Sequence, residues 1–293
     1  MTDTRDPVDA SDAAGLYGPT SEAWRINREG VLLLASGPRA ILLQIAHPLV
    51  AEGVDQYSDF RRDPWTRLQA TVRSYMTIVY GSKWVARAEI RRLNGLHRSI
   101  AGPVKDGSAR AAFGERYAAR TPELSLWVHA TLVESIITAY DAWIEPLPRE
   151  RRARFYDETI PIGRGFGIPP GLLPADLEAF EAYVASMLAP DGPVHPTPTA
   201  RTLARYVLHP RLDALIPFLG WVPPVAYDWL TWPAIGLLPA RLRDEFEIPW
   251  GPGRAATAAW LKFGLQQGRL LFPERWRSFP IANRADDRVR AAQ

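Results

Sequence analysis

The fold class of this chain is decided by the stretch TPELSLWVHATLVESIITAY, which runs from Thr121 to Tyr140. Thr121 and Pro122 are typical of a helix start, because proline is favoured in the first turn, where a backbone N–H has no helical partner anyway. Apolar residues then occupy nearly every side of the expected helix. A helix of this kind must be covered by its neighbours on all sides. The sequence therefore predicts a central, buried helix in an all-α protein.

Two helices are expected on the N-terminal side of this stretch. The first runs from Ser21, its N-cap, to about Ser36, and Gly37 is expected to stop it. The second begins around Pro38 and carries a long apolar run. Pro48 cannot donate the next helical hydrogen bond, so we expect it to kink or end the second helix.

The clearest helical periodicity lies between Asp63 and Gly81, where a proline follows the N-cap and a glycine closes the pattern. A further helix is expected from Ser82, its N-cap, to about Ile100. Sustained two-residue alternation is rare, so we expect essentially no sheet. More helices are expected at residues 149–160, 175–189, 198–208, 225–237 and 254–267.

The chain has 293 residues, of which 47% are apolar, and this is enough for a substantial core. It shows no internal repeat and no shift in composition that would mark a domain boundary. Residues 1–20 are polar and acid-rich and are expected to form a flexible N-terminal segment. We therefore expect a single multi-helix domain over residues 21–293.

Composition and charge exclude several classes of function. With no cysteine, the chain cannot hold an iron–sulfur cluster, a zinc ribbon or a thiolate-ligated haem. The balance of 35 basic and 32 acidic residues includes no block of like charge, so we expect no nucleic-acid partner. The N-terminus lacks the basic start and apolar run of a secretory signal, which predicts a cytoplasmic protein.

One apolar, tryptophan-rich region, from Ala214 to Ala240, could bring the protein to a membrane. Five prolines interrupt it, which argues against a membrane-spanning helix. Two interpretations remain open, namely short helices packed over the core and helices in peripheral contact with a membrane surface.

The chain has five histidines, His47, His97, His129, His195 and His209. His195 lies between prolines in an expected loop and His209 precedes a proline at a helix end, so neither is favoured as a functional residue. The other three lie in helices that are expected to be buried. A buried imidazole needs a partner for its ring nitrogens, so each is either a hydrogen-bonded core residue or a metal ligand.

Other catalytic arrangements lack their motifs. The chain has no Glu-x-x-His for a di-iron bundle, no His-Glu-x-x-His and no Gly-x-Ser-x-Gly. The glycine cluster Gly163–Gly167 has no preceding strand and no following Lys-Ser/Thr, so phosphate binding is not favoured there. Haem remains, since it requires a slot between helices, one imidazole and distal polar groups. His97, Arg67 and Thr71 lie on neighbouring expected helices and could supply these groups.

Three motifs carry a resemblance to a known family. They are Gly37-Pro38-Arg39-Ala40-Ile41-Leu42-Leu43-Gln44-Ile45-Ala46-His47-Pro48, Phe60-Arg61-Arg62-Asp63-Pro64-Trp65-Thr66-Arg67-Leu68 and Trp127-Val128-His129-Ala130-Thr131-Leu132-Val133-Glu134-Ser135. With them the chain resembles the catalytic domain shared by MpaB-like oxygenases and rubber oxygenases (latex clearing proteins), from about Gly30 to about Ser278. The resemblance implies an all-α fold with a buried pocket for haem b and an oxygenase that uses dioxygen.

The resemblance also implies roles for individual residues. In the rubber-cleaving branch an Arg and a Thr four residues apart lie on the distal side of haem, and Arg67 and Thr71 match that spacing. A Lys precedes that Thr, whereas this chain has Ala70, so the resemblance carries over neither a distal lysine ligand nor the rubber substrate. The proximal histidine of the family best matches His97, which is therefore the expected iron ligand.

Further cofactor-binding residues follow from the same resemblance. His129 and Thr131 match a helix that lines the haem pocket, and His129 is the second choice as iron ligand. His47 is the third choice. Glu134 is either an acid or base in catalysis or the partner of an arginine, and pairing is favoured.

The sequence thus predicts a haem b-dependent oxygenase that cleaves a carbon–carbon double bond of an apolar, isoprenoid-type substrate. Two alternatives remain open. One is a haem monooxygenase or peroxygenase of a small secondary metabolite, and the other is a non-catalytic protein that binds haem or an apolar ligand at a membrane surface.

Overall fold

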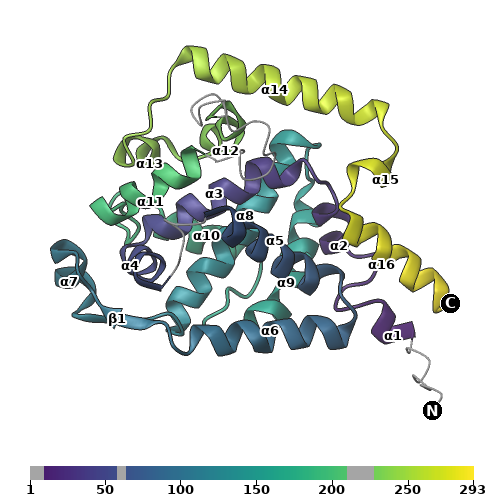
Figure 1. The fold of residues 1–293 in the computed structure, drawn as a ribbon, viewed down its shortest axis with the longest axis horizontal. Coiled ribbons are helices and arrows are strands. Elements are labelled where there is room, and N and C mark those ends of the chain that lie inside the picture. The colour runs from purple at the N-terminus through teal and green to yellow at the C-terminus, as the bar shows by residue number, and fades with distance from the viewer. Residues whose placement is uncertain (1–9, 58–63, 210–227) are drawn as a thin grey trace.

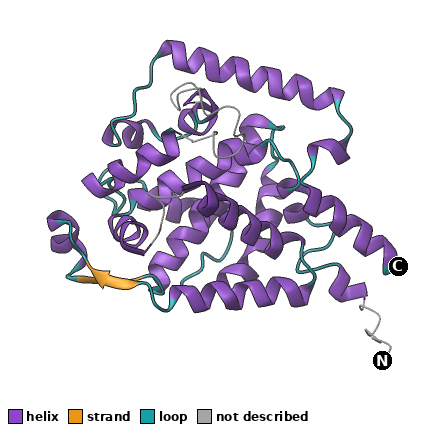
Figure 2. Ribbon diagram, viewed as in Figure 1, coloured by secondary structure: helices purple, strands orange, loops and turns teal. Residues whose placement is uncertain are grey.

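A computed structural model describes residues 10–57, 64–209 and 228–293, with the backbone alone for residue 10 and for residues 64–68. The prediction of an all-α fold is confirmed, since helices account for nearly all regular structure in these residues (Figure 2). The exception is one antiparallel pair of three-residue strands, β1 (Ala101–Pro103) and β2 (Arg116–Ala118). The domain limits proposed above stay a prediction.

The N-terminal helices differ from the prediction. They are α1 (Ala10–Ala13), α2 (Glu22–Asn27), α3 (Leu32–Ala46) and α4 (Pro48–Tyr57). Ser21 caps α2 as expected, and its hydroxyl accepts a hydrogen bond from Trp24 N at 3.1 Å. The prediction that one helix runs from Ser21 to Ser36 and stops at Gly37 is wrong. The helix is interrupted at residues 28–31, and α3 continues through Gly37 and Pro38.

Long-range contacts explain this break. The carboxylate of Glu29 accepts hydrogen bonds from Arg269 Nη2 and Arg277 Nη1, both at 2.8 Å. Gly30 N donates to Arg277 O at 2.9 Å, and a Cβ on Gly30 would lie only 3.0 Å from that oxygen. These contacts hold the connection between α2 and α3 against the C-terminal part of the chain. Proline inside α3 costs one helical hydrogen bond, and the extensive burial of α3 offsets that loss.

Pro48 behaves as predicted. Helix α3 ends at Ala46, α4 begins at Pro48, and the helix direction changes by 105° between them. Within the described residues no single helix is both long and apolar enough to cross a membrane, although this bent pair meets the same test of length and composition.

Helices α5 (Pro64–Tyr80) and α6 (Lys83–His97) begin where the capping signals predict, and they form an antiparallel hairpin. Gly81 ends α5, and the Ser82 hydroxyl accepts from Val85 N at 3.4 Å. After α6, the two short strands frame α7 (Gly107–Phe113). Buried Glu52 of α4 holds this unit in place, because its carboxylate accepts from the backbone nitrogens of Lys105 and Asp106 at 3.0 and 2.9 Å.

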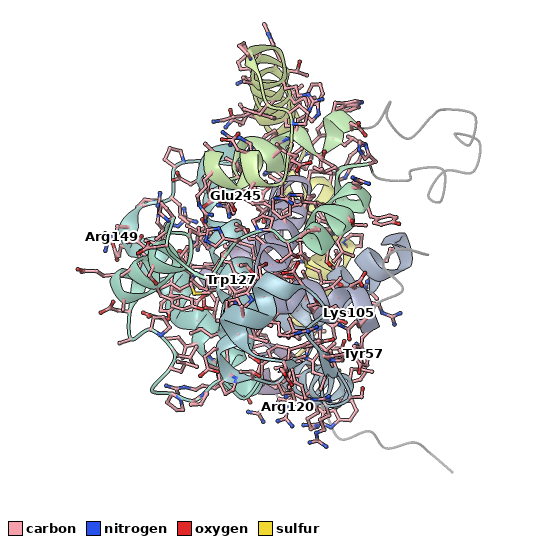
Figure 3. All side chains as sticks on the ribbon, turned by 90° about the vertical axis from the view of Figure 1, so that its left-hand side faces the viewer. Tyr57, Lys105, Arg120, Trp127, Arg149 and Glu245 are labelled. Carbon is pink, nitrogen blue, oxygen red and sulfur yellow. The ribbon has the colours of Figure 1, made fainter. Side chains whose placement is uncertain are left out.

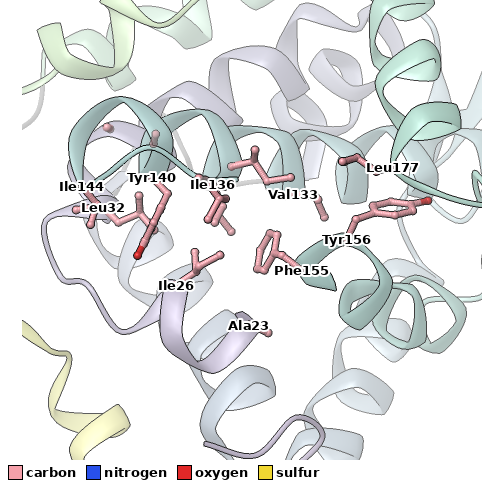
Figure 4. Packing of buried hydrophobic residues seen from close by; sticks show 14 of the residues in the cluster. Ala23, Ile26, Leu32, Val133, Ile136, Tyr140, Ile144, Phe155, Tyr156 and Leu177 are labelled. Carbon is pink, nitrogen blue, oxygen red and sulfur yellow. The ribbon is translucent and has the colours of Figure 1, made fainter. Parts of the chain in front are cut away.

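The predicted central helix is α8 (Pro122–Trp143), and it lies in the middle of the protein with α3 packed along it (Figure 1). Trp127 of α8 is 1% exposed and lies in the interior of the molecule (Figure 3). One core forms around α8, where Val133 and Ile136 face Phe155 and Ile26 (Figure 4). The helices that follow are α9 (Arg149–Gly165), α10 (Leu177–Met187) and α11 (Pro198–Leu208).

The C-terminal part continues the helical pattern with α12 (Trp232–Gly236), α13 (Ala240–Glu245), α14 (Pro252–Leu271), α15 (Glu274–Arg277) and α16 (Pro280–Ala291). The membrane contact expected at residues 214–240 falls partly outside the described residues, which resume at Asp228. In the part that is described, Ile235 and Leu238 are buried in the core that α3 and α11 share. These residues pack inside the protein and are not available to a membrane.

Candidate functional site

The C-terminal end of α9 lies between α8 and α6, and glycines allow both approaches. A Cβ on Gly163 would lie 2.9 Å from Leu173 Cδ2 and 3.4 Å from Nε2 of His129. A Cβ on Gly165 would lie 3.3 Å from Ile90 of α6. Side chains of residues that are two positions apart in a helix point to nearly opposite sides of it. One glycine therefore faces α8 and the other faces α6, and the cluster that phosphate chemistry could not explain has a packing role.

His129 is the candidate histidine with a buried nitrogen that lacks a partner. Its side chain projects from α8 toward α9, it is 8% exposed, and Nε2 has no hydrogen-bond partner. Burial lowers the pKa of this imidazole to about 4, so it is neutral near pH 7. A neutral imidazole with an available lone pair is the form that binds a metal. Here, however, the backbone of α9 at Gly163 packs directly against that nitrogen.

His97 lies on the other side of α9, at the C-terminal end of α6, and is partly buried. It continues the inner stripe of α6, since Ala86 and Ile90 are buried and lie on the same face. One turn earlier, Asn94 Nδ2 donates to Gly165 O at 2.8 Å. Helix α9 ends at this level, so His97 lies just beyond the contact between α6 and α9.

The register of the α5–α6 hairpin places His97 relative to the predicted distal residues. Ile78 of α5 packs with Ile90 of α6, and Arg92 Nη2 donates to Ser74 Oγ at 3.1 Å. Helices rise by the same amount per residue, so this antiparallel register can be continued toward the end of α6. It brings His97 level with the turn of α5 from Arg67 to Thr71. Thr71 is exposed, and the side chain of Arg67 lies outside the described residues.

Thr131 does not share a face with His129. Trp127 Nε1 donates to Leu43 O of α3 at 3.2 Å, and Ser135 Oγ accepts from Arg39, which also belongs to α3. Thr131 lies one turn from each of these residues and therefore on the α3 side of α8. It is 1% exposed, and its hydroxyl donates to Val128 O at 2.8 Å. The structure thus separates two residues that the sequence had grouped.

His47 is also separate from this region, because it caps the end of α3 at the bend into α4. Its Nδ1 accepts from Leu49 N at 3.3 Å, and its ring lies 5.2 Å from that of Phe113. Burial lowers its pKa to about 4. These contacts give His47 a complete role in helix capping and packing.

The two remaining histidines pair with acidic residues near the surface. His209 Nδ1 lies 2.8 Å from Asp228 Oδ1, and His195 Nδ1 lies 3.4 Å from a carboxylate oxygen of Glu245. About half of each histidine side chain is exposed to solvent. Both rings therefore lie outside the core, away from the buried candidate histidines.

Glu134 pairs with Arg39, as was favoured over a catalytic role. Arg39 of α3 is 3% exposed, and its guanidinium binds both carboxylate oxygens, with Nη2 donating to Oε1 at 2.9 Å. The same guanidinium donates to Leu237 O and to Ser135 Oγ at 3.0 and 2.9 Å. The pair therefore links α3, α8 and the end of α12.

Over residues 10–57, 64–209 and 228–293, no group of three or more His, Asp or Glu side chains is arranged to hold a metal ion. Two surface hollows, of about 350 and 470 Å³, are lined by α14 and by residues near the C-terminus, and neither is lined by a candidate histidine. A cofactor such as haem needs only one protein imidazole, so isolated histidines would be sufficient to hold it.

The fold and this arrangement define a class, namely an all-helical protein with isolated histidines in and beside its core. The chain belongs to the family described as "ER-bound oxygenase mpaB/B'/Rubber oxygenase, catalytic domain", which it matches over residues 24–265. The family resemblance inferred from the sequence motifs is thereby confirmed, and the family is one of oxygenase catalytic domains.

Two mycobacterial proteins are similar to this chain. They are the uncharacterized protein Mb2261 of Mycobacterium bovis and the uncharacterized protein Rv2237 of Mycobacterium tuberculosis. Each is 24% identical over 241 residues, which cover 80% of this chain and 88% of the relative. No solved structure matches this chain.

Sequence reasoning missed the residues that shape this region. Gly163 and Gly165 were judged only as a phosphate loop, although two glycines separated by one residue near a helix end can also allow close packing on two sides. The partner of Glu134, Arg39, lies far away in sequence, and no local pattern identifies it.

Proposed function

We propose that this chain is a haem b-dependent oxygenase that uses dioxygen to cleave a carbon–carbon double bond of an apolar, isoprenoid-type substrate. Membership of the oxygenase family supports the reaction class. The observation that carries the assignment of residues is the register of the α5–α6 hairpin, which brings His97 level with the turn from Arg67 to Thr71.

The donor chemistry of this region fits haem. Histidine is the common axial ligand of haem b, and the chain has imidazoles on both sides of the end of α9. The orphaned Nε2 of His129 fits as a donor, but even a Cβ on Gly163 would lie 3.4 Å from that nitrogen and 2.9 Å from Leu173 Cδ2, so α9 leaves no space there for a macrocycle. His97 lies one turn beyond Asn94, whose side chain marks the contact between α6 and the end of α9. For this reason His97 is the ligand that we favour.

When bound, haem b supplies the activation of dioxygen. His97 would hold the group through one ring nitrogen. Arg67 and Thr71 would provide a guanidinium and a hydroxyl as hydrogen-bond donors that stabilise negative charge on the reacting oxygen. Ala70 contributes no polar atom beside them.

Hemin titration of the purified chain tests this assignment. We expect a Soret band at a stoichiometry near one haem per chain, and we expect His97→Ala to lose most of it. His129→Ala and the matched control His195→Ala, whose histidine is 45% exposed, should retain it. The far-UV circular dichroism of each variant verifies that it is folded.

Each other outcome changes the assignment. Loss of the Soret band in His129→Ala with retention in His97→Ala would move the ligand to α8 and require α9 to shift. A wild-type chain that takes up no hemin would overturn the haem proposal altogether. With haem bound, products formed from an isoprenoid alkene under labelled dioxygen should carry both oxygen atoms as carbonyl groups, whereas a monooxygenase would incorporate one.

A further inference from the structure

Helix α6 lies along one edge of the protein, and its outer side is basic (Figure 1). Ala86 and Ile90 are buried and mark the inner side of the helix. At 3.6 residues per turn, the residues opposite to them lie within about 100° of one another. These are Trp84, Arg87, Ala88, Arg91, Gly95 and Arg98, and the three arginines among them are exposed. We call Arg87, Arg91 and Arg98 the α6 arginine row.

The α6 arginine row has no counter-charge within the part of the chain that the structure describes. No carboxylate there forms an ion pair with any of its three guanidinium groups. Glu89, the one acidic residue of α6, lies on another side of the helix and pairs with Arg92. Arg87 and Arg91 are one turn apart, and like charges at that spacing repel each other. The row is therefore a surface on which positive charge is left uncompensated.

The helices beside α6 bring little acidic charge to this row. Helix α5 contains no acidic residue. Helix α9 contacts α6 at Gly165, and its nearest acidic residue in sequence, Glu158, lies about two turns earlier. Helix α1 contributes Asp12, whose carboxylate accepts from Trp84 N at 3.0 Å. Asp12 therefore lies at the start of α6, at the other end of the helix from Arg98.

We propose that the α6 arginine row docks an acidic α-helix of a protein partner. Guanidinium groups bind carboxylates through two parallel hydrogen bonds, which lysine cannot do. The three arginines are separated by four and seven residues, so they are spaced by about 6 and 10.5 Å along α6. Because four and seven residues are whole turns of a helix, a partner helix with acidic residues at the same intervals would present one carboxylate to each arginine.

The rest of the outer side fits a partner helix better than a lipid bilayer. Ala88 and Gly95 lie beside the row, and a Cβ on Gly95 would meet nothing within 4 Å, so a partner backbone can come close there. Trp84 is 69% exposed at one end of the row, and tryptophan is enriched among the residues that dominate protein interfaces. A bilayer favours a broad apolar side that can be inserted, and Trp84 is the one large apolar residue on this side of α6.

A labelled helical peptide tests the proposal on the purified full chain. The peptide carries glutamates at the intervals of the row, and a second peptide carries glutamines at the same positions. Fluorescence anisotropy should show binding of the glutamate peptide alone, and the binding should weaken as salt is added. The double variant Arg87→Glu, Arg91→Glu should bind it at least about tenfold more weakly. Trp84→Gln should weaken the binding and leave its dependence on salt unchanged.

The double variant Arg205→Glu, Arg284→Glu is the matched control. Both arginines are exposed, they lie on α11 and α16, and their reversal changes the net charge of the chain by the same amount. This control should bind the peptide as the wild type does, and circular dichroism verifies that each variant is folded. The measurement needs no haem, so its outcome is independent of the proposed function.

Three results would overturn the proposal. A loss in the control as large as in Arg87→Glu, Arg91→Glu would show an effect of net charge alone. A wild type that binds neither peptide would leave the row without the proposed partner. Binding to phosphatidylglycerol vesicles or to duplex DNA, without binding to the glutamate peptide, would assign the row to a bilayer or to nucleic acid instead.

Discussion

Replacing Glu134 by glutamine separates a structural carboxylate from a catalytic one. The wild-type carboxylate binds the buried guanidinium of Arg39 through both oxygens and also accepts from Thr138 Oγ1 at 2.9 Å. Glutamine keeps one acceptor oxygen and the shape of the side chain, but it removes the negative charge. The guanidinium then remains buried among Leu237 O and Ser135 Oγ without a counter-ion.

The expected cost follows from burial. Removing one partner of a fully buried ion pair costs about 3–5 kcal/mol. The Glu134 side chain is 19% exposed and the amide still accepts one hydrogen bond, so we expect a loss of about 2–3 kcal/mol in the free energy of unfolding. A chain of this length unfolds with an entropy of roughly 0.6 kcal/mol/K, so Tm should fall by about 3–5 °C.

Urea and thermal unfolding, measured beside hemin uptake, test this expectation. Glu150→Gln is the matched control, because Glu150 is 82% exposed and pairs with Arg154 on the same helix, so its loss should change stability by less than about 0.5 kcal/mol. We expect Glu134→Gln to be less stable and to retain hemin uptake and oxygen consumption below its unfolding transition. A variant as stable as the wild type that has lost oxygen consumption would refute the structural role.

Two further predictions concern the buried histidines. The folded-state pKa values of His47 and His129 are lowered from 6.5 to about 4, so the unfolded chain binds more protons between these values. The contribution of these histidines to the stability of the haem-free chain is therefore complete above about pH 6.5 and is lost as the pH falls toward 4. At about pH 5 the loss is about 2 kcal/mol for each histidine. Urea unfolding midpoints across this range should show the loss, and His129→Gln should make their dependence on pH less steep. Gly163→Ala places a methyl 3.4 Å from His129 Nε2 and 2.9 Å from Leu173 Cδ2, so the leucine side chain must shift. With His97 as ligand, the hemin affinity of the folded variant should stay within about twofold of wild type. A much larger loss in spectroscopic titration, with circular dichroism unchanged, would favour His129.

Local signals predicted the helices whose ends are set by nearby residues. Ser82 caps α6, proline opens α8, and α3 ends just before Pro48, each at the position that the sequence indicated. The periodicity of α8 also predicted its central place, because a helix that is apolar on all sides has few other environments. Caps and periodicity act within one or two turns, so they can be recognised without the rest of the fold.

The errors arise where distant residues decide. The break between α2 and α3 depends on Glu29 meeting Arg269 and Arg277, which lie more than two hundred residues further along. Because the interruption falls at residues 28–31, α3 starts at Leu32 and Gly37 lies inside it. In the same way α9 was expected to end near residue 160, yet it continues through Pro161 to Gly165 because its end is packed between α8 and α6.

The candidate site was predictable only as a set of residue types. Sequence spacing placed Arg67, Thr71 and His97 on neighbouring helices, and the hairpin register agrees with that placement. It could not reveal that α9 lies between His97 and His129, nor that Thr131 faces α3. Such relations depend on which helices become neighbours, and the resemblance to a family supplies residue roles without supplying the packing of this chain.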